Sequence, residues 1–172
     1  QWDVVQRQDL NLGLVEPSSA RLAHELAQLP GVTSLEPSRG AAVRIHFQGR
    51  SRQIGLRSLL PDGRHSRAVD AAGREIAPPP DGIILSAKLA AVLGARIGDT
   101  LVVEALEGRR PVGERTLVAL AEAFTGIAAY MDLHAINRFL GEGDVITGAS
   151  IGLDPARRGE FLAALKEIPR VN

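Results

Sequence analysis

The chain has 172 residues, no cysteine, and 20 basic against 20 acidic residues, so its formal net charge is zero. The missing cysteines exclude disulfides, thiolate catalysis and cysteine-ligated zinc, and the balanced charge without a basic stripe argues against a nucleic-acid partner. Aromatic residues make up only 3%, which argues against a stacking platform for bases or sugars, and no apolar run approaches the roughly 20 residues that a membrane-spanning helix needs.

The first third predicts four strands and one helix. Leu10, Leu12 and Leu14 alternate with other residue types at the period of a strand. Pro17, Ser18 and Ser19 are expected to open a helix that carries Leu22, Leu26 and Leu29 on its buried stripe and ends at Pro30-Gly31. Strands are then expected over residues 32–35 and 41–48, with a hairpin turn at Gly49-Arg50 and a returning strand through Leu56.

Residues 60–81 differ in character from the rest of the chain. They are rich in Pro, Gly, Asp and Arg and end in three consecutive prolines, which predicts an exposed loop or an irregular hairpin. Loops on a rigid scaffold often carry specificity, so this segment is the candidate for partner contact; a merely variable loop is the alternative. The candidate residues are Pro61, Asp62, Arg64, His65, Pro78, Pro79 and Pro80.

The segment from Gly82 to Leu106 has well-defined local signals. An apolar strand over residues 83–85 leads to Ser86 at a helix N-cap position, and Gly94 suits the left-handed end of that helix. Gly98-Asp99 is a turn signal before the strand that starts at Leu101. The later elements expected are a strand over 115–120, a helix over 133–140 capped by Asp132, a strand over 147–153, and a last helix from Asp154-Pro155 that buries Phe161, Leu162, Leu165 and Ile168.

The first and last thirds echo each other. Each contains a strand and a helix followed by Leu-Pro-Gly-Val at 29–32 or Ile-Pro-Arg-Val at 168–171, where Pro ends the helix and Val opens the next strand. Two such units predict an α+β chain with a ferredoxin-like, split-βαβ layer. A mostly-β insertion with two short helices is expected between them. The expected boundaries are residues 1–59 and 146–172 for the two halves and 60–145 for the insertion.

The polar residues show no catalytic, cofactor or metal constellation. His24, His46, His65 and His134 each lack a second ligand at metal spacing, and Asp62, His65 and Asp70 share one loop without further carboxylates. Asp99 is expected to be a turn former. The arginines at 44, 50, 52 and 57 favour a solvated sheet face, with a surface for anionic headgroups as the alternative.

The pattern Gly-Ile-Ile-Leu-Ser-x-x-Leu-Ala-x-x-Leu-Gly-x-x-x-Gly-Asp-x-Leu over residues 82–101 resembles the extracytoplasmic domain of FtsX/MacB/LolC-type ABC transporter permeases. Residues 29–37, residues 129–132 with the helix that follows, and residues 162–171 match the same family in the same order. The resemblance therefore extends over nearly the whole chain, with the segments in the order that the family has.

The resemblance implies a porter-like subdomain made of the two halves and a sabre-like insertion, outside the cytoplasmic membrane between two flanking transmembrane helices. It implies an inner-membrane protein whose domain faces the periplasm or the cell exterior. ATP would be hydrolysed on a separate ATP-binding subunit or domain. This domain would be no enzyme and need no cofactor, but would transmit motion and contact a partner protein or a lipid or lipoprotein substrate. Both ends of the chain are expected to continue into longer segments.

Two other functions are weighed against this one. Paired βαβ units also occur in ligand-binding regulatory or sensor modules, which would hold a ligand in a closed apolar pocket. A hydrolase using Asp99 or Asp132 would need a carboxylate beside a His in a cleft. An apolar run of about 20 residues just before Gln1 and another soon after Asn172 would discriminate in favour of the transporter domain.

Overall fold

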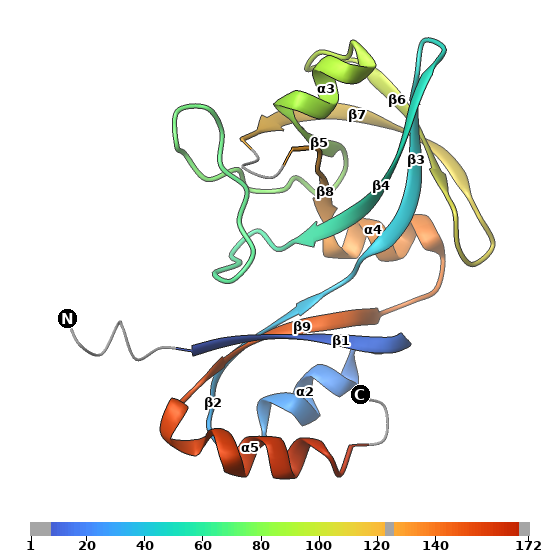
Figure 1. Ribbon diagram of the computed structural model, residues 1–172. Helices are drawn as coiled ribbons and strands as arrows, with labels where there is room; N and C mark the ends of the chain where they lie inside the picture. Colours follow the sequence, from blue (N-terminus) through green and yellow to red (C-terminus); the bar gives the residue numbers. More distant parts are fainter. Residues whose placement is uncertain (1–7, 123–125, 169–172) are drawn as a thin grey trace. The chain divides into compact units, whose positions relative to one another are not determined.

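The computed structural model describes residues 8–122 and 126–168 (Figure 1). The chain divides into two compact units, residues 1–38 with 144–172 and residues 39–143. We call the first the split-sheet unit and the second the barrel unit, and each is described by itself.

Three strands make the sheet of the split-sheet unit among the described residues: β1 (Gln8–Ser19), β2 (Val32–Ser38) and β9 (Val145–Leu153). Their order is β1-β9-β2, and β9 is antiparallel to both neighbours. β1 and β2 are therefore parallel to each other with β9 inserted between them, which is the split-βαβ arrangement. The expected α+β, ferredoxin-like class is confirmed.

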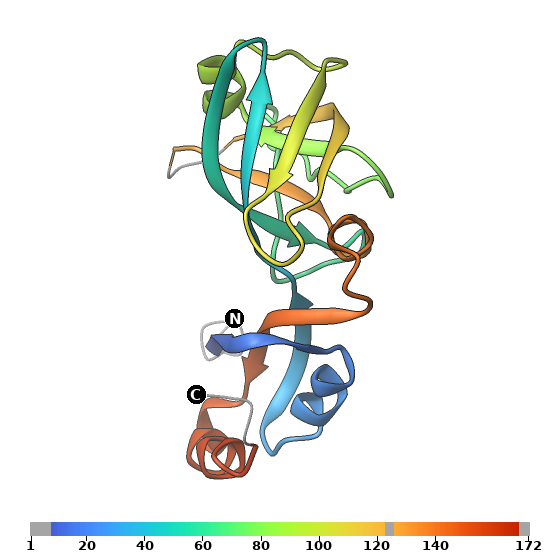
Figure 2. The ribbon, with the colours of Figure 1, turned by 90° about the vertical axis from the view of Figure 1, so that its right-hand side faces the viewer.

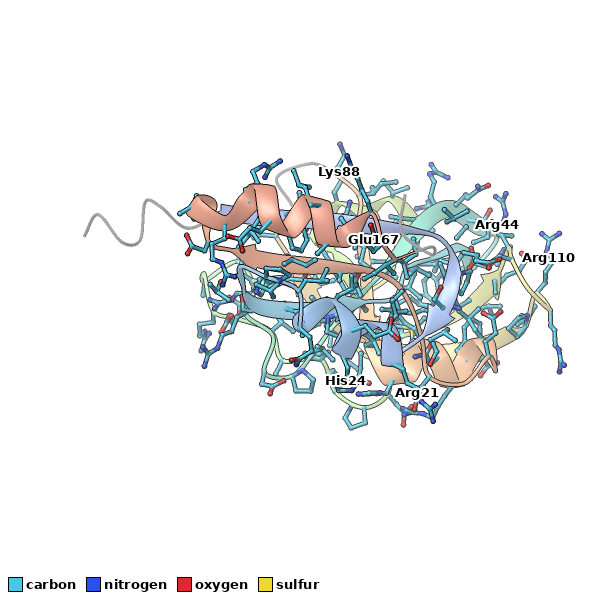
Figure 3. All side chains as sticks on the ribbon, turned by 90° about the horizontal axis from the view of Figure 1, so that it is seen from below. Arg21, His24, Arg44, Lys88, Arg110 and Glu167 are labelled. Atoms are coloured by element: carbon cyan, nitrogen blue, oxygen red, sulfur yellow. The ribbon has the colours of Figure 1, made fainter. Side chains whose placement is uncertain are left out.

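Two helices cover one face of this sheet, α2 (Arg21–Ala27) and α5 (Arg158–Leu165), the second preceded by the 3₁₀ turn η1 (Pro155–Arg157). Seen from below in Figure 3, they lie side by side in front of the strands, with Arg21 and His24 of α2 at the solvent side. Their apolar stripes meet the inward side chains of β9. The buried core consists of Leu22, Leu26, Ile146, Ala149, Ile151, Leu153 and Phe161.

Three details of this unit differ from the sequence prediction or lie beyond it. Pro17, Ser18 and Ser19 belong to β1, because a bulge after Gly13 lets Ser18 and Ser19 pair with β9, and the helix begins only at Arg21. Leu162 is 36% exposed, since the buried face of α5 is set by Phe161 and Leu165. The strand expected to open at Val171 lies outside the described residues.

The barrel unit contains six strands and two helices within its described residues. The strands close into a barrel of order β3-β4-β8-β5-β7-β6, and Figure 2 shows β4, β3 and β6 as neighbouring arrows in teal, cyan and yellow. The elements are β3 (Ala41–Phe47), β4 (Arg50–Leu59), β5 (Ile83–Ser86), α3 (Ala87–Leu93), β6 (Thr100–Ala105), β7 (Val112–Ala121), β8 (Ala129–Asp132) and α4 (Leu133–Leu140).

The barrel is built from two topologically equivalent halves. Each half runs hairpin, connection, four-residue strand, helix: β3-β4-β5-α3 and then β6-β7-β8-α4. Exchanging the halves leaves the strand order unchanged. Each hairpin pairs in parallel with the short strand of the other half, β4 with β8 and β7 with β5, while β3 pairs antiparallel with β6 and β5 antiparallel with β8. The barrel therefore has a pseudo-twofold topology, and each half is completed by the other.

The two helices of the barrel unit have matching ends. Ser86 accepts a hydrogen bond from the Leu89 N–H at 3.2 Å, and Asp132 accepts one from the Ala135 N–H at 3.1 Å. Both helices end at a glycine with a positive φ, 76° at Gly94 and 67° at Gly141, where an L side chain would be strained. Each N-cap contributes about 1 kcal/mol to helix stability.

The sequence prediction placed two features of the barrel unit incorrectly. The β3-β4 turn is centred on Gln48 and Gly49, both with positive φ, one residue before the predicted Gly49-Arg50. The strand β8 was missed because it has only four residues and leads directly into α4.

The expected domain boundaries also need correction. The structure puts the first boundary at Ser38/Arg39 and the second at Gly143/Asp144, where the sequence had suggested 59/60 and 145/146. The first differs because the hairpin β3-β4 pairs with β6 and β8, and so contributes two barrel strands.

Arg39, the first residue of the barrel unit, has a fully buried side chain. Its Nε donates to Asn137 Oδ1 at 3.1 Å, its Nη1 to the Gly40 carbonyl at 3.0 Å and its Nη2 to Glu142 Oε1 at 2.5 Å. Glu107 Oε1 lies 3.8 Å from Nη1. One guanidinium thus links the start of the unit to α4, to the second residue after α4, and to the β6-β7 connection.

The substitution Arg39→Met tests this link. It keeps most of the side-chain volume but removes every hydrogen bond of the guanidinium, and we expect the free energy of unfolding to fall by about 3 kcal/mol. Arg44→Met is the matched control, since Arg44 is half-exposed and its Nη2 donates to Gln53 at 3.2 Å; it should cost about 0.5 kcal/mol. Urea unfolding measures both, and equal costs would contradict the role given to Arg39.

A second pair of variants tests the packing of the split-sheet unit. A Cβ at Gly148 would lie 2.6 Å from the Leu12 carbonyl oxygen and 3.0 Å from Ser38 Oγ. Gly148→Ala must therefore push β9 away from its neighbours, at a cost of about 1–3 kcal/mol. At its register partner Gly13, an added Cβ would meet nothing within 4 Å, so Gly13→Ala should be neutral or stabilise by about 0.5 kcal/mol. The urea midpoint should therefore fall in Gly148→Ala and stay the same or rise in Gly13→Ala.

Candidate functional site

The two halves of the barrel unit differ most in one connection. Residues 60–82, 23 in number, join β4 to β5, whereas residues 122–128, seven in number, join β7 to β8. The residues just before the two connections, Leu59 and Ala121, occupy equivalent positions. Each pairs with a helix N-cap residue, Leu59 with Asp132 and Ala121 with Ser86. Seven residues therefore suffice to make this connection, and 16 residues of the first one are surplus to closing the barrel. We call residues 60–82 the long connection, and it is the candidate site (green trace at the left of Figure 1).

A small hairpin orders the middle of the long connection. Val69 bridges to Glu75, the Ile76 N–H donates to the Ala68 carbonyl at 2.8 Å, and the Glu122 N–H donates to the Val69 carbonyl at 2.7 Å. At its tip Asp70 Oδ1 accepts from the N–H groups of Ala72 and Arg74, at 2.9 and 3.0 Å. An aspartate that bonds the backbone two and four residues on is a stable turn former, so this part is an ordered hairpin attached to the end of β7.

Apolar contacts hold the hairpin on the barrel wall. Ala68 is 3% exposed and clusters with the buried side chains of Leu59, Ile84 and Ala121, while Ile76 packs against the same cluster. The long connection therefore covers the outer side of β4, β5, β7 and β8.

The C-terminal end of the long connection is tied to α4. Arg138 Nη2 donates to the Pro80 carbonyl at 2.7 Å and lies 3.6 Å from Asp81 Oδ1. Pro78 is buried. Fixed φ angles at three consecutive prolines and an anchored carbonyl leave this end little conformational freedom.

The candidate residues predicted from sequence are distributed unevenly over this surface. Exposed side chains are those of Pro61, Asp62, Arg64 and Pro80, and those of His65 and Pro79 are half-buried. Pro78 is buried, so its side chain is unsuited to contact a partner. The sequence reading missed Arg67 and Glu75, whose Nε and Oε1 atoms lie 2.9 Å apart across the hairpin. The Asp-Ala-Ala-Gly turn at 70–73 between short apolar runs was the available signal for this hairpin.

A cavity of about 230 Å³ lies within the long connection. Leu59 and Ala68 form buried apolar parts of its wall, and Arg67 and Glu75 are exposed members that pair with each other. Of the residues that line it, Leu59 alone belongs to a barrel strand. The lining consists of Leu59, Leu60, Pro61, Gly63, Ser66, Arg67, Ala68, Glu75, Ile76 and Ala77.

Three carboxylates elsewhere in the described part of the barrel unit, Asp99, Asp132 and Glu104, have structural partners. Asp99 Oδ2 accepts from the Arg96 N–H at 2.8 Å, as a turn former does, and Asp132 caps α4. Glu104 Oε1 lies 2.9 Å from His46 Nε2, and this hydrogen bond lowers the pKa of Glu104. Within residues 8–122 and 126–168, no group of three or more His, Asp or Glu side chains could hold a metal ion, so Asp62, His65 and Asp70 make no such cluster. These groups stabilise turns, helix ends and strand pairs.

Comparison with solved structures relates both units together to one kind of domain. The chain is similar to the extracellular domain of the noncanonic ABC-type transporter YknZ from Gram-positive bacteria, with a TM-score of 0.61 and 13% identity over 92% of this chain and 94% of that one. It is also similar to the periplasmic region of MacB from Actinobacillus actinomycetemcomitans, with a TM-score of 0.60 and 10% identity over 94% and 83% of the two chains. No family model matches the sequence, and no curated protein matches it.

At these identities the likeness is one of fold. No helix in the described part of the chain is long and apolar enough to cross a membrane. The chain thus has the fold shared by the extracellular domain of the ABC-type transporter YknZ and the periplasmic region of MacB, as the sequence resemblance implied.

Proposed function

We propose that this chain is an extracytoplasmic domain of an ABC transporter permease, which transmits ATP-driven motion and contacts a substrate or partner protein outside the membrane. In the full protein it would be anchored by flanking transmembrane helices in the inner membrane and face the periplasm or the cell exterior. ATP would be hydrolysed by a separate ATP-binding subunit or domain. The likeness of fold over more than nine-tenths of this chain supports this reading.

The observation that carries the contact role is the surplus length of the long connection. The second half of the barrel makes the equivalent connection with seven residues, and the first half uses 23. Loops far longer than the fold requires are commonly functional or disordered. This one is held by an Asp70 turn, an apolar cluster and the Arg138 contact, which favours a preformed contact surface.

The transmission role is supported by the way in which the barrel unit is closed. Arg39 follows the segment by which the chain enters the unit, and Glu142 precedes the segment by which it leaves. Their ion pair joins these two segments of the barrel unit, whose six strands form one closed barrel. A displacement of either segment would move the barrel as a body, since packed interiors deform little.

A ligand-binding sensor module is the alternative. It would need a pocket that encloses a small molecule, and such pockets measure about 300–1,000 Å³. The cavity of the long connection, at about 230 Å³, is smaller than that and has exposed walls. The transporter reading is therefore preferred.

Transport by the full-length permease tests the proposal. Deleting residues 62–77 removes 16 residues and leaves seven to join β4 to β5. The deletion should therefore leave the barrel folded and lower transport about tenfold, equivalent to ~1.4 kcal/mol of lost interaction. Because the deletion also uncovers Ile84 and Ala121, a second variant changes only the surface. Asp62→Arg with Arg74→Glu reverses two exposed charges and removes only the exposed pairing of Arg74 Nε with Asp70 Oδ2, 3.8 Å apart. It should lower transport in the same direction with little change in the melting temperature, because exposed ion pairs contribute little to stability.

The matched control reverses one exposed charge of each sign elsewhere on the barrel unit, with Arg52→Glu and Glu114→Arg, so that the net charge stays unchanged as it does in the test variant. It should transport as the unaltered permease does. Normal transport by both long-connection variants would refute the contact role. If a small molecule raises the melting temperature of the domain and none of the variants alters transport, the sensor module is favoured instead.

A further inference from the structure

We propose that the cavity of the long connection is an anchor pocket that receives one large apolar side chain from the surface of a partner protein. This inference rests on the proposed function and names the kind of partner that the long connection recognises. Almost all of the cavity wall comes from the surplus segment itself. The extra residues therefore do more than lengthen a loop. They form a concave surface, which the seven-residue connection is too short to form.

The size of the cavity selects a group as large as a side chain. A cavity of about 150 Å³ is enough for one benzene molecule, and drug-sized ligands need about 300 Å³ or more. At about 230 Å³, this cavity has room for one side chain of the size of Phe, Tyr, Leu or Met. Burying one such side chain in a pocket is how a few residues supply most of the binding energy at protein interfaces.

The charge of the rim excludes a strongly charged occupant. Arg67 and Glu75 are each about half exposed, and their side chains are 2.9 Å apart. Because they neutralise each other, neither is available as an unpaired counter-charge for a phosphate, a carboxylate or an ammonium group. The lining combines apolar side chains, Leu59 and Ala68 with half-buried Ile76 beside them, with polar ones at the edge. Its apolar part favours a neutral group with an apolar body, next to the Arg67–Glu75 ion pair.

A protein side chain fits this geometry better than an acyl chain. Each methylene group of a lipid gains affinity only while it finds apolar surface to cover, and a cavity of this size is filled long before a membrane acyl chain ends. A side chain is short enough to be buried whole. Its own backbone would then lie over the exposed residues Pro61, Arg67 and Ala77 at the cavity edge.

Binding of small side-chain mimics to the chain of 172 residues tests the pocket directly. Toluene, 4-methylphenol and 3-methylbutan-1-ol stand for Phe, Tyr and Leu, and methyl NMR signals of Leu59, Ala68 and Ile76 report on the cavity wall. We expect saturable shifts with dissociation constants on the order of 1–10 mM, as suits fragments of this size. If no mimic shifts these signals, the pocket is refuted.

Two leucine substitutions provide a matched pair. Ala77 lines the cavity and is exposed, so Ala77→Leu can fill the cavity without disturbing the core. Ala71 is also exposed, at the hairpin tip, and is not among the residues that line the cavity. Ala77→Leu should abolish the shifts and Ala71→Leu should leave them unchanged, both with an unaltered melting temperature. Equal binding by the two variants would place the mimics elsewhere and overturn the proposal.

A series of n-alkanols from propanol to decanol separates a side chain from a lipid. For a pocket of side-chain size, affinity should rise about fourfold per methylene group and then level off within the series. A rise that continues to decanol would indicate an acyl-chain site and overturn the assignment to a protein partner.

Transport then distinguishes this inference from the function on which it rests. In the full-length permease, Ala77→Leu should lower transport and Ala71→Leu should not. If Ala77→Leu transports normally while Asp62→Arg with Arg74→Glu does not, the long connection contacts the partner without using the pocket, and only the pocket is refuted. If none of these variants alters transport, the contact role fails as well.

Discussion

The buried guanidinium of Arg39 is the interaction on which the barrel unit depends. It is the first residue of that unit, and its hydrogen bonds reach α4 through Asn137 and the end of the unit through Glu142. Burying a charged group away from water is costly unless the charge is paired. Arg39 can therefore remain buried only while the segment by which the chain enters the barrel unit stays next to the segment by which it leaves. The same contact that satisfies the charge therefore makes the inserted unit a closed body with both ends at one place in its structure.

The pseudo-twofold topology explains which parts of the barrel unit are constrained. Each hairpin needs the short strand of the other half, so neither half can be shortened or displaced without opening the barrel. The helix caps Ser86 and Asp132 lie at equivalent positions beside Ala121 and Leu59. The connections that follow Leu59 and Ala121 are free of this requirement. The long connection is the place where the chain has departed from symmetry, and the departure is large enough to form a cavity.

Sequence patterns with a local physical cause predicted most elements. Each of these patterns acts within a few residues, and each matches the structure. They are the alternation of apolar residues over 41–48, the N-caps Ser86 and Asp132, and the C-terminal Gly94. What depends on distant pairing was not predictable in the same way. Ser18 and Ser19 join β1 because β9 offers a partner across a bulge, and β8 is a strand because β4 and β5 flank it. The burial of Arg39 has the same cause, since its partners lie about 100 residues further along the chain.

The candidate site is where local and distant causes combine. Its prolines and glycines predicted a loop. The loop is ordered because of the Asp70 turn, the β-bridge between Val69 and Glu122, and the apolar cluster with Ile84. An ordered surface binds with less loss of conformational entropy than a mobile one. A cavity whose wall is anchored in three places, and whose rim charges are already paired, is therefore ready to receive an apolar group without rearrangement. Asp70, Asp99 and Asp132 serve turns and a helix cap, and Glu104 pairs with His46 across two strands. The preformed shape of the cavity is therefore the feature of the barrel unit that best suits recognition.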